Sequence, residues 1–163
     1  MSQDIIYSHS EDDPSRVLIP SVIVDQLNQF QQTGLQDLEA GGLLLGLRRG
    51  PHIEIVRITS PLQSDIRTRT SFHRRDLGHF ELADQHWMDS QHTVGYVGEW
   101  HTHPEPLPTP SLIDATEWRR VMRTEKRATI FLIVGTCNWF VGRGPVRTML
   151  WPLPQKWERL RRV

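Results

Sequence analysis

The stretch from Gly98 to Asp114, GEWHTHPEPLPTPSLID, combines two histidines, four prolines, a serine and an aspartate in one short segment. His101 and His103 lie two residues apart. Because side chains alternate between the two faces of a strand, both imidazoles leave the same face and can meet one ion. Histidine and carboxylate suit Zn²⁺, and a catalytic zinc keeps three protein ligands and an exchangeable water. We therefore expect a third ligand, for which Asp114 is the nearest candidate.

The same stretch also fits a strand that passes through a proline-rich turn into an ordinary capped helix. Ser111 has the residue type of an N-cap, and Asp114 stands where the helix dipole favours a negative charge. A lone His-x-His pair is common by chance and often marks a strand with surface histidines. On these residues alone both interpretations stand. The prolines fix φ and so stiffen the turn that would hold Asp114 over the strand end.

Length and composition indicate one ordinary domain of 163 residues, large enough to bury a core without a disulfide or a structural metal. Lys plus Arg and Asp plus Glu both number 19, and the zero net charge argues against a general nucleic-acid binder. The single cysteine, Cys137, excludes an intrachain disulfide and fits a reducing cytosol. The strand-like sequence around Cys137 predicts a buried structural thiol. A catalytic nucleophile is not expected, because no nearby residue supplies the base that would activate it.

The sequence shows neither a secretory signal at its start nor an apolar run long enough to span a membrane. The start lacks a basic segment followed by an apolar run, and the apolar residues 128–135 are too few to cross a bilayer. We therefore expect a soluble, cytoplasmic protein without a membrane partner. Residues 1–15 are polar and acidic, which predicts a loosely held segment, and 154–163 form a basic C-terminal tail.

Hydrophobic periodicity predicts a mixed α/β domain with about five to seven strands. Apolar spacing, caps and glycine stops indicate helices over 19–34, 75–90 and 110–125. Alternating or continuous apolar runs indicate strands over 41–50, 51–60, 93–103, 127–135, 137–143 and 146–153. Residues 60–73, which are rich in Ser, Thr and Arg, are expected to form a loop. In the strand over 93–103, Trp100 alternates away from the histidines and should belong to the core.

A zinc site that activates water also needs a carboxylate that does not bind the metal tightly. The segment DLEAGGLLLG (37–46) offers Glu39, just ahead of a Gly-Gly pair and an apolar strand. Taken alone, an acidic residue at such a junction is usually solvated. The arginines of the following loop are also expected to be solvated. The alternative is that they bind an acidic partner or the carboxylate of a protein tail. These residues are Arg67, Arg69, Arg74 and Arg75.

Taken together, EAGGLLLG (39–46) and HTHPEPLPTPSLID (101–114) resemble the signature of the JAB/MPN metalloprotease family, also called JAMM. That signature is a glutamate before a glycine-rich strand, then His-x-His-Pro, six residues, and Ser-x-x-Asp. The five motif positions all agree with it. The resemblance implies a single JAB/MPN domain over 1–163, with a curved, barrel-like mixed sheet flanked by helices and related to the cytidine-deaminase-like folds.

The resemblance also implies a mechanism. One zinc per chain would be held by His101, His103 and Asp114 together with a water. Glu39 would activate that water and pass its proton to the leaving amine, while Ser111 would hydrogen-bond the developing oxyanion. Because scaffold-type members of the family lose one or more of these residues, the intact set favours an active enzyme.

Family members hydrolyse isopeptide or peptide bonds after the C-terminal tail of ubiquitin or ubiquitin-like proteins. The stretch SFHRRDLGHFELADQHW (71–87) is similar to a bacterial subgroup found with ubiquitin-transfer-like enzymes in anti-phage CBASS operons. Those proteins remove conjugates made through the C-terminus of the cyclic-nucleotide synthase, the CD-NTase. The resemblance thus implies an isopeptidase whose partner is an extended protein tail, with no nucleic acid and no membrane. Such a tail would add as a strand beside the site.

Two other functions stay open at this point. One is a non-catalytic MPN-like module that binds a partner's tail, and the other is a peptidase that matures a small sulfur-carrier protein. A cupin-type site fits poorly, because it needs a glutamate ligand where this chain has prolines.

Overall fold

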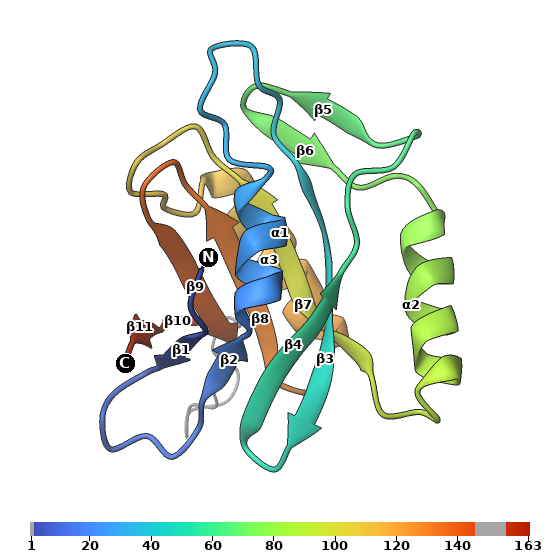
Figure 1. Cartoon of the computed structure of the whole chain (residues 1–163), viewed down its shortest axis with the longest axis vertical. Helices are drawn as coiled ribbons and strands as arrows, with labels where there is room; N and C mark the ends of the chain where they lie inside the picture. Colours follow the sequence, from blue (N-terminus) through green and yellow to red (C-terminus); the bar gives the residue numbers. More distant parts are fainter. Residues whose placement is uncertain (1, 146–155) are drawn as a thin grey trace.

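The structure, a computed structural model, describes residues 2–145 and 156–163. Its helices are α1 (Ser21–Asn28), α2 (Gly78–Asp89) and α3 (Leu112–Thr124). The longer strands are β3 (Gly41–Arg49), β4 (His52–Ile58), β7 (Gly95–Thr102), β8 (Thr129–Val134) and β9 (Trp139–Gly144). The shorter ones are β1 (Ile5–Ser8), β2 (Val17–Ile19), β5 (Ile66–Thr68), β6 (Ser71–His73), β10 (Glu158–Arg159) and β11 (Arg161–Arg162). Figure 1 shows their arrangement.

Nine of these strands form one curved mixed sheet in the order β10-β9-β8-β7-β3-β4-β2-β1-β11. The β7–β8 and β2–β4 pairs are parallel, and the other pairs are antiparallel. Every residue of β8 is buried, as its continuous apolar run predicts for a strand covered on both faces. The expected fold class is therefore confirmed, with more strands than predicted because the additional ones are only two to four residues long.

The C-terminal segment closes the sheet into a barrel-like shape. On one side β10 pairs with β9, with Glu158 opposite Arg143, and on the other β11 pairs with β1, with Arg162 opposite Tyr7. Leu160, between the two short strands, is 3% exposed and belongs to the core. The basic tail is thus part of the sheet. The strand expected over 146–153 lies outside the described residues.

The expectation that residues 1–15 are loosely held does not apply to residues 5–8, which form β1. The β1 strand pairs with β2 through Ile5, Ile6 and Tyr7, and its Ser8 hydroxyl donates to the carbonyls of Ser10 and Ser15. The polar composition concealed one short strand whose apolar residues join the core cluster.

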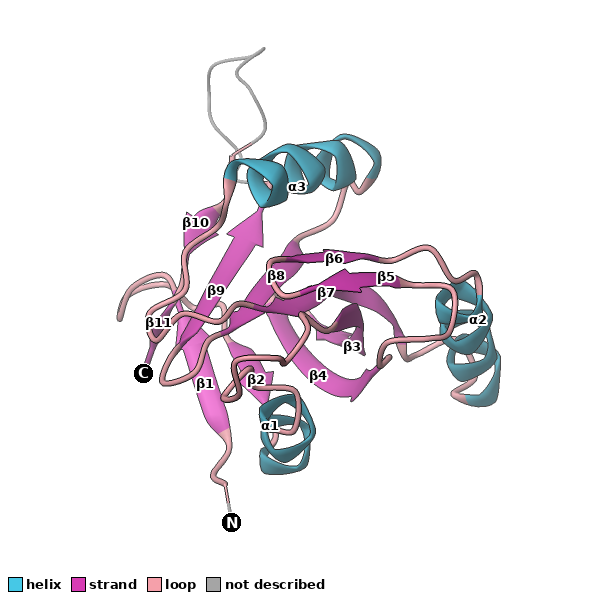
Figure 2. Ribbon diagram, turned by 90° about the horizontal axis from the view of Figure 1, so that it is seen from above, coloured by secondary structure: helices cyan, strands magenta, loops and turns pink. Residues whose placement is uncertain are grey.

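Helices cover the sheet on opposite sides (Figure 2). Ile23, Val24 and Leu27 of α1 are buried in the larger core cluster. On the other face, Trp118 of α3 stacks on Phe131 of β8 with ring centroids 4.7 Å apart. This packing fixes the middle of α3 against β8. Within the described chain, no helix is both long and apolar enough to cross a membrane.

The loop expected over 60–73 instead contains the β5–β6 hairpin, where the Thr68 and Ser71 hydroxyls lie 2.7 Å apart. Its polar, three-residue strands are too short for a periodicity signal. The prediction of a loop there is therefore wrong.

A buried polar chain ties this hairpin and α2 to the main sheet. Asp65 Oδ2 lies 2.7 Å from His79 Nε2, and His79 Nδ1 lies 2.6 Å from Thr59 Oγ1. The Thr59 carbonyl accepts the Trp100 indole N–H at 3.0 Å. Although burial raises the pKa of Asp65, hydrogen bonds from backbone amides and His79 lower it to about 2. The start of the hairpin and the start of α2 are therefore linked through Thr59 to Trp100 of β7.

Candidate metal centre

The two histidines lie where β7 ends. His101 is the last but one residue of that strand, and His103 continues the extended backbone by donating its N–H to the Val134 carbonyl at 3.0 Å. Both rings leave the same face, as predicted, with Nε2 atoms 3.1 Å apart and ring centroids 4.9 Å apart. The strand thus brings two nitrogen donors to one point.

Asp114, the third residue of α3, lies beside them. Its Oδ1 is 3.3 Å from His101 Nε2, and its Oδ2 is 3.3 Å from His103 Nε2. The capped helix is also confirmed, because Ser111 Oγ accepts the Asp114 N–H and Asp114 Oδ2 accepts the Ser111 N–H at 2.7 Å. The two interpretations of this segment are therefore compatible, since the cap itself orients the carboxylate.

Several observations indicate that these three residues fit a metal ion. One donor atom from each lies within 4.8 Å of the others. Burial raises the pKa of Asp114, but hydrogen bonds with His101 and His103 hold it well below its usual range, so it is a carboxylate. Burial lowers the pKa of His103, yet the neighbouring carboxylates, Asp114 first, raise it overall. The site therefore favours added positive charge, and its donors are nitrogen and carboxylate oxygen.

The proline-rich turn is held by hydrogen bonds from the connection between β8 and β9. The carbonyls of Glu105 and Pro106 accept the N–H groups of Thr136 at 2.9 Å and Asn138 at 3.0 Å. A Cβ added to Gly135 would lie 2.5 Å from the Glu105 carbonyl oxygen, so only glycine allows this approach. The turn that separates His103 from α3 is therefore supported by the β8–β9 connection, which sequence periodicity does not reveal.

An acidic residue at such a junction is usually solvated, but Glu39 is buried, with 4% of its surface exposed. Its N–H donates to the Thr68 carbonyl at 2.8 Å, and Arg67 Nε donates to its carbonyl at 2.6 Å. Burial raises the pKa of the Glu39 carboxyl to about 7; His103 opposes the shift, and Asp114 and Glu105 add to it. The hairpin therefore holds a carboxyl that can both take and release a proton near neutral pH.

All five motif residues line one groove of about 620 Å³. They are Glu39, His101, His103, Ser111 and Asp114. One wall of the groove is β6 and the residues after it, and another is the first part of α3. Glu39 and His101, 62 residues apart in the sequence, thus face the same space, which gives an acid/base group beside a metal-ligand cluster.

The solvated-loop interpretation is wrong for three of the four arginines. Arg67 is bonded to the Glu39 carbonyl, and Arg69 Nη1 donates to the Gly34 and Leu35 carbonyls. Arg74 Nη2 lies 2.5 Å from Glu99 Oε1 in the groove. These side chains fix the loops around the site, a role that only long-range contacts disclose.

Two further residues that the sequence did not single out position the site. Thr102, between the histidines, points to the opposite face, where its hydroxyl accepts the Ala40 N–H and donates to Gln32 Oε1, both at 3.0 Å. Gln32 is 2% exposed and donates to the Asp37 and Arg69 carbonyls. Strand alternation could have indicated Thr102, whereas nothing local indicates Gln32.

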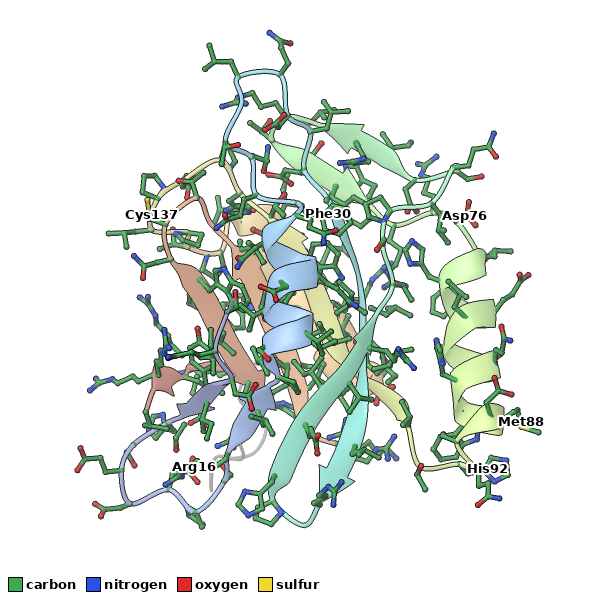
Figure 3. All side chains as sticks on the ribbon, viewed as in Figure 1. Arg16, Phe30, Asp76, Met88, His92 and Cys137 are labelled. Carbon is green, nitrogen blue, oxygen red and sulfur yellow. The ribbon has the colours of Figure 1, made fainter. Side chains whose placement is uncertain are left out.

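Two smaller expectations have opposite outcomes. Trp100 is 1% exposed and belongs to the core, as predicted. Cys137 is exposed, so the prediction of a buried thiol is wrong. The reason is that Cys137 lies in the turn before β9 and not within a strand, as its label in Figure 3 shows.

Comparison with known families gives one matching model. Residues 22–151 match the model described as prokaryotic homologs of the JAB domain. That range contains every motif position of the groove.

Two curated proteins, each named "CD-NTase/cGAS isopeptidase", are similar over most of the chain. The protein from Escherichia coli (strain TW11681) is 39% identical and covers 82% of this chain and 85% of its own length. The one from Pseudomonas aeruginosa (strain BWHPSA011 / Pa011) is 44% identical and covers 69% of this chain and 72% of its own. Among solved structures, a Desulfitobacterium hafniense protein matches with a TM-score of 0.55 at 18% identity, over 77% of this chain and 82% of that one. This last similarity concerns the fold alone.

Proposed function

The chain belongs to the family of prokaryotic homologues of the JAB domain, and from that premise we propose that it is a zinc isopeptidase acting after the C-terminal tail of a protein conjugate. The observation that carries the proposal is the meeting of three metal-ligand side chains with the buried Glu39 carboxyl in one groove.

The ligand separations are compatible with a bound zinc ion. A tetrahedral shell with bonds of about 2.0 Å has edges of about 3.3 Å between neighbouring ligand atoms. The separations here are 3.1 Å between the two Nε2 atoms and 3.3 Å from each to an Asp114 oxygen. When bound, zinc supplies a Lewis acid for the carbonyl oxygen and lowers the pKa of water to about 7.

The protein's own groups supply the remaining chemistry. Glu39, a buried carboxyl outside the ligand cluster, takes the proton of the attacking water and delivers it to the leaving amine. Ser111 Oγ already accepts the Asp114 N–H, so its own hydroxyl hydrogen is available to donate to the carbonyl oxygen as negative charge develops.

The hairpin suggests how a tail binds. The outer edge of β5 is occupied, because the Thr68 carbonyl accepts the Glu39 N–H. Residues Ser71–His73 of β6 line the groove, and within the described structure no strand other than β5 pairs with them. An extended tail can therefore add to this edge through main-chain hydrogen bonds. Because relatives bear the name CD-NTase/cGAS isopeptidase, the tail we propose is that of a CD-NTase.

The substrate is tested with a CD-NTase whose C-terminal carboxyl is joined to the ε-amine of a lysine peptide. Intact mass spectrometry should detect the free amine and the free C-terminus, together heavier than the conjugate by one water. Matched linear fusions serve as a second arm. Cleavage of linear fusions to a small sulfur-carrier protein, without cleavage of the isopeptide, would contradict the proposal in favour of precursor maturation, and binding of the tail without cleavage would favour a non-catalytic module.

Replacing Ser111 with alanine is expected to lower turnover by about 10²–10³-fold, the usual effect of losing one oxyanion donor. Loss of the N-cap should also lower the free energy of unfolding by about 1 kcal/mol. Ser111→Thr keeps both the hydroxyl donor and the cap, and should retain most of the activity. Steady-state turnover on the conjugate and thermal melts check both effects; full turnover in the alanine variant would exclude Ser111 from the mechanism.

A further inference from the structure

A second cavity, of about 840 Å³, lies away from the metal groove and shares no lining residue with it. It is formed by α1, β1, the start of β9 and the C-terminal segment that closes the sheet; in Figure 1, β9 and the C-terminal strands are on the left and α1 is nearer the centre. Its volume is in the range of pockets that hold small molecules.

The charge of this cavity is one-sided. Arg159, Arg161 and Arg162 line it, and no aspartate or glutamate does, although the whole chain has zero net charge. Within the described part of the chain, none of these arginines forms an ion pair. His9, the fourth basic lining residue, is paired with Glu158 at 3.2 Å. The guanidinium of Arg159 lies over the Phe140 ring, 5.3 Å from its centroid, whereas Arg161 and Arg162 are exposed residues of β11, so the lining carries an excess of positive charge.

A tyrosine hydroxyl faces the same end. Tyr7 is 8% exposed and lines the cavity, and its hydroxyl has no hydrogen-bond partner among residues 2–145 and 156–163. Burial raises the pKa of Tyr7, while the charges of Arg162 and Arg159 oppose the shift. Arg162 lies directly opposite Tyr7 in the β1–β11 pair, so the phenol adds a neutral donor beside a charged one.

The other end of the cavity has a different chemistry. Trp139, the half-buried first residue of β9, offers a flat aromatic surface, and the amides of Asn28 and Asn138 offer donors and acceptors. Cys137 lies beside them at the turn (Figure 3). An aromatic ring with nearby amides suits a flat heterocycle, which can stack on the ring and hydrogen-bond with the amides.

We propose that this cavity binds a nucleoside phosphate, with the phosphates against Arg161 and Arg162 and the base against Trp139. Arginine recognises phosphate through paired, charge-assisted hydrogen bonds, which supply the affinity, and the ring and amides discriminate the base. The inference is independent of the proposed hydrolase, because the two cavities are separate.

Isothermal titration of the full chain with ATP tests the proposal, with inorganic triphosphate, adenosine and a glutamate-rich peptide as separate arms. ATP should bind at least about tenfold more tightly than triphosphate or adenosine. The double variant Arg161→Ala, Arg162→Ala should weaken ATP binding at least about tenfold. Trp139→Leu should weaken binding of ATP but not of triphosphate.

The matched control is Arg57→Ala, since Arg57 is an exposed arginine of β4 outside the cavity lining. It should leave ATP binding unchanged, and thermal melts should show that all variants are folded. Absence of ATP binding to the wild type, equal loss in the Arg57 variant, equal affinity for triphosphate, or tighter binding of the peptide would each overturn the proposal.

Discussion

Turnover of the conjugate should fall by about 10²–10⁴-fold when Glu39 is replaced with glutamine, the usual range for the loss of a general acid/base. Glutamine has nearly the same shape but cannot take a proton. Because Glu39 is not one of the three clustered ligand residues, metal content should stay at that of the wild type. Initial rates on the isopeptide conjugate, with metal measured in the same preparation, check both expectations.

The matched control is Glu54→Gln, which neutralises a half-buried glutamate of β4 paired with Arg49. It should retain wild-type turnover. Full activity of the Glu39 variant would contradict the proposed mechanism. Loss of metal from this variant would mean that Glu39 is a metal ligand and not an acid/base group.

The same substitution should change the pH dependence of stability in the metal-free protein. The folded-state pKa of Glu39 is about 7, against an ordinary value of 4.5, so the folded state binds this proton more tightly. The resulting stabilisation is fully present below about pH 4.5 and is lost as pH rises through 7. Glu39→Gln lacks this loss, so above pH 7 its free energy of unfolding should exceed that of the wild type by about 3 kcal/mol. Urea unfolding at pH 4.5 and 8, with chelator present, measures the difference.

Removing the carboxylate ligand has the second large effect. Asp114→Asn should lower metal affinity by about 10²-fold or more and, at limiting zinc, turnover in proportion. Asparagine can still accept the Ser111 N–H through its carbonyl oxygen, so the cap of α3 should remain. Competition with a chromophoric chelator gives the affinity, and circular dichroism reports the helix.

The control for this variant is Asp89→Asn, an exposed aspartate at the end of α2. It removes the same charge far from the groove and should leave affinity and turnover unchanged. Unaltered zinc affinity in the Asp114 variant would show that the His-His-Asp cluster is not the metal site.

Long apolar segments made much of the fold predictable. The strands β3, β4, β7 and β8 and the helix α3 lie where periodicity places them, because each is long enough to bury a continuous face. The short strands β1, β5, β6, β10 and β11 have two to four residues and depend on partners distant in the sequence. Local patterns cannot predict such strands, and the hairpin beside the site is one of them.

The local half of the site was similarly predictable. His101 and His103 follow from strand alternation, and Ser111 and Asp114 from helix capping at fixed spacing. Glu39 is a candidate base from its position before the glycine pair, but only the family resemblance distinguishes it from an ordinary solvated glutamate. The contacts that hold it, from Arg67 and Thr68, join residues 28 and 29 positions away. These contacts form only when the hairpin folds, so no local sequence pattern predicts them.

The central claim is that metal bound by His101, His103 and Asp114 enables hydrolysis, and titration of zinc into chelator-treated protein tests it most directly. Cleavage of the isopeptide conjugate should start near zero, rise in proportion to bound zinc and reach its plateau at one zinc per chain. Full cleavage by protein that contains no metal, or an inactive protein at one bound zinc per chain, would contradict the account.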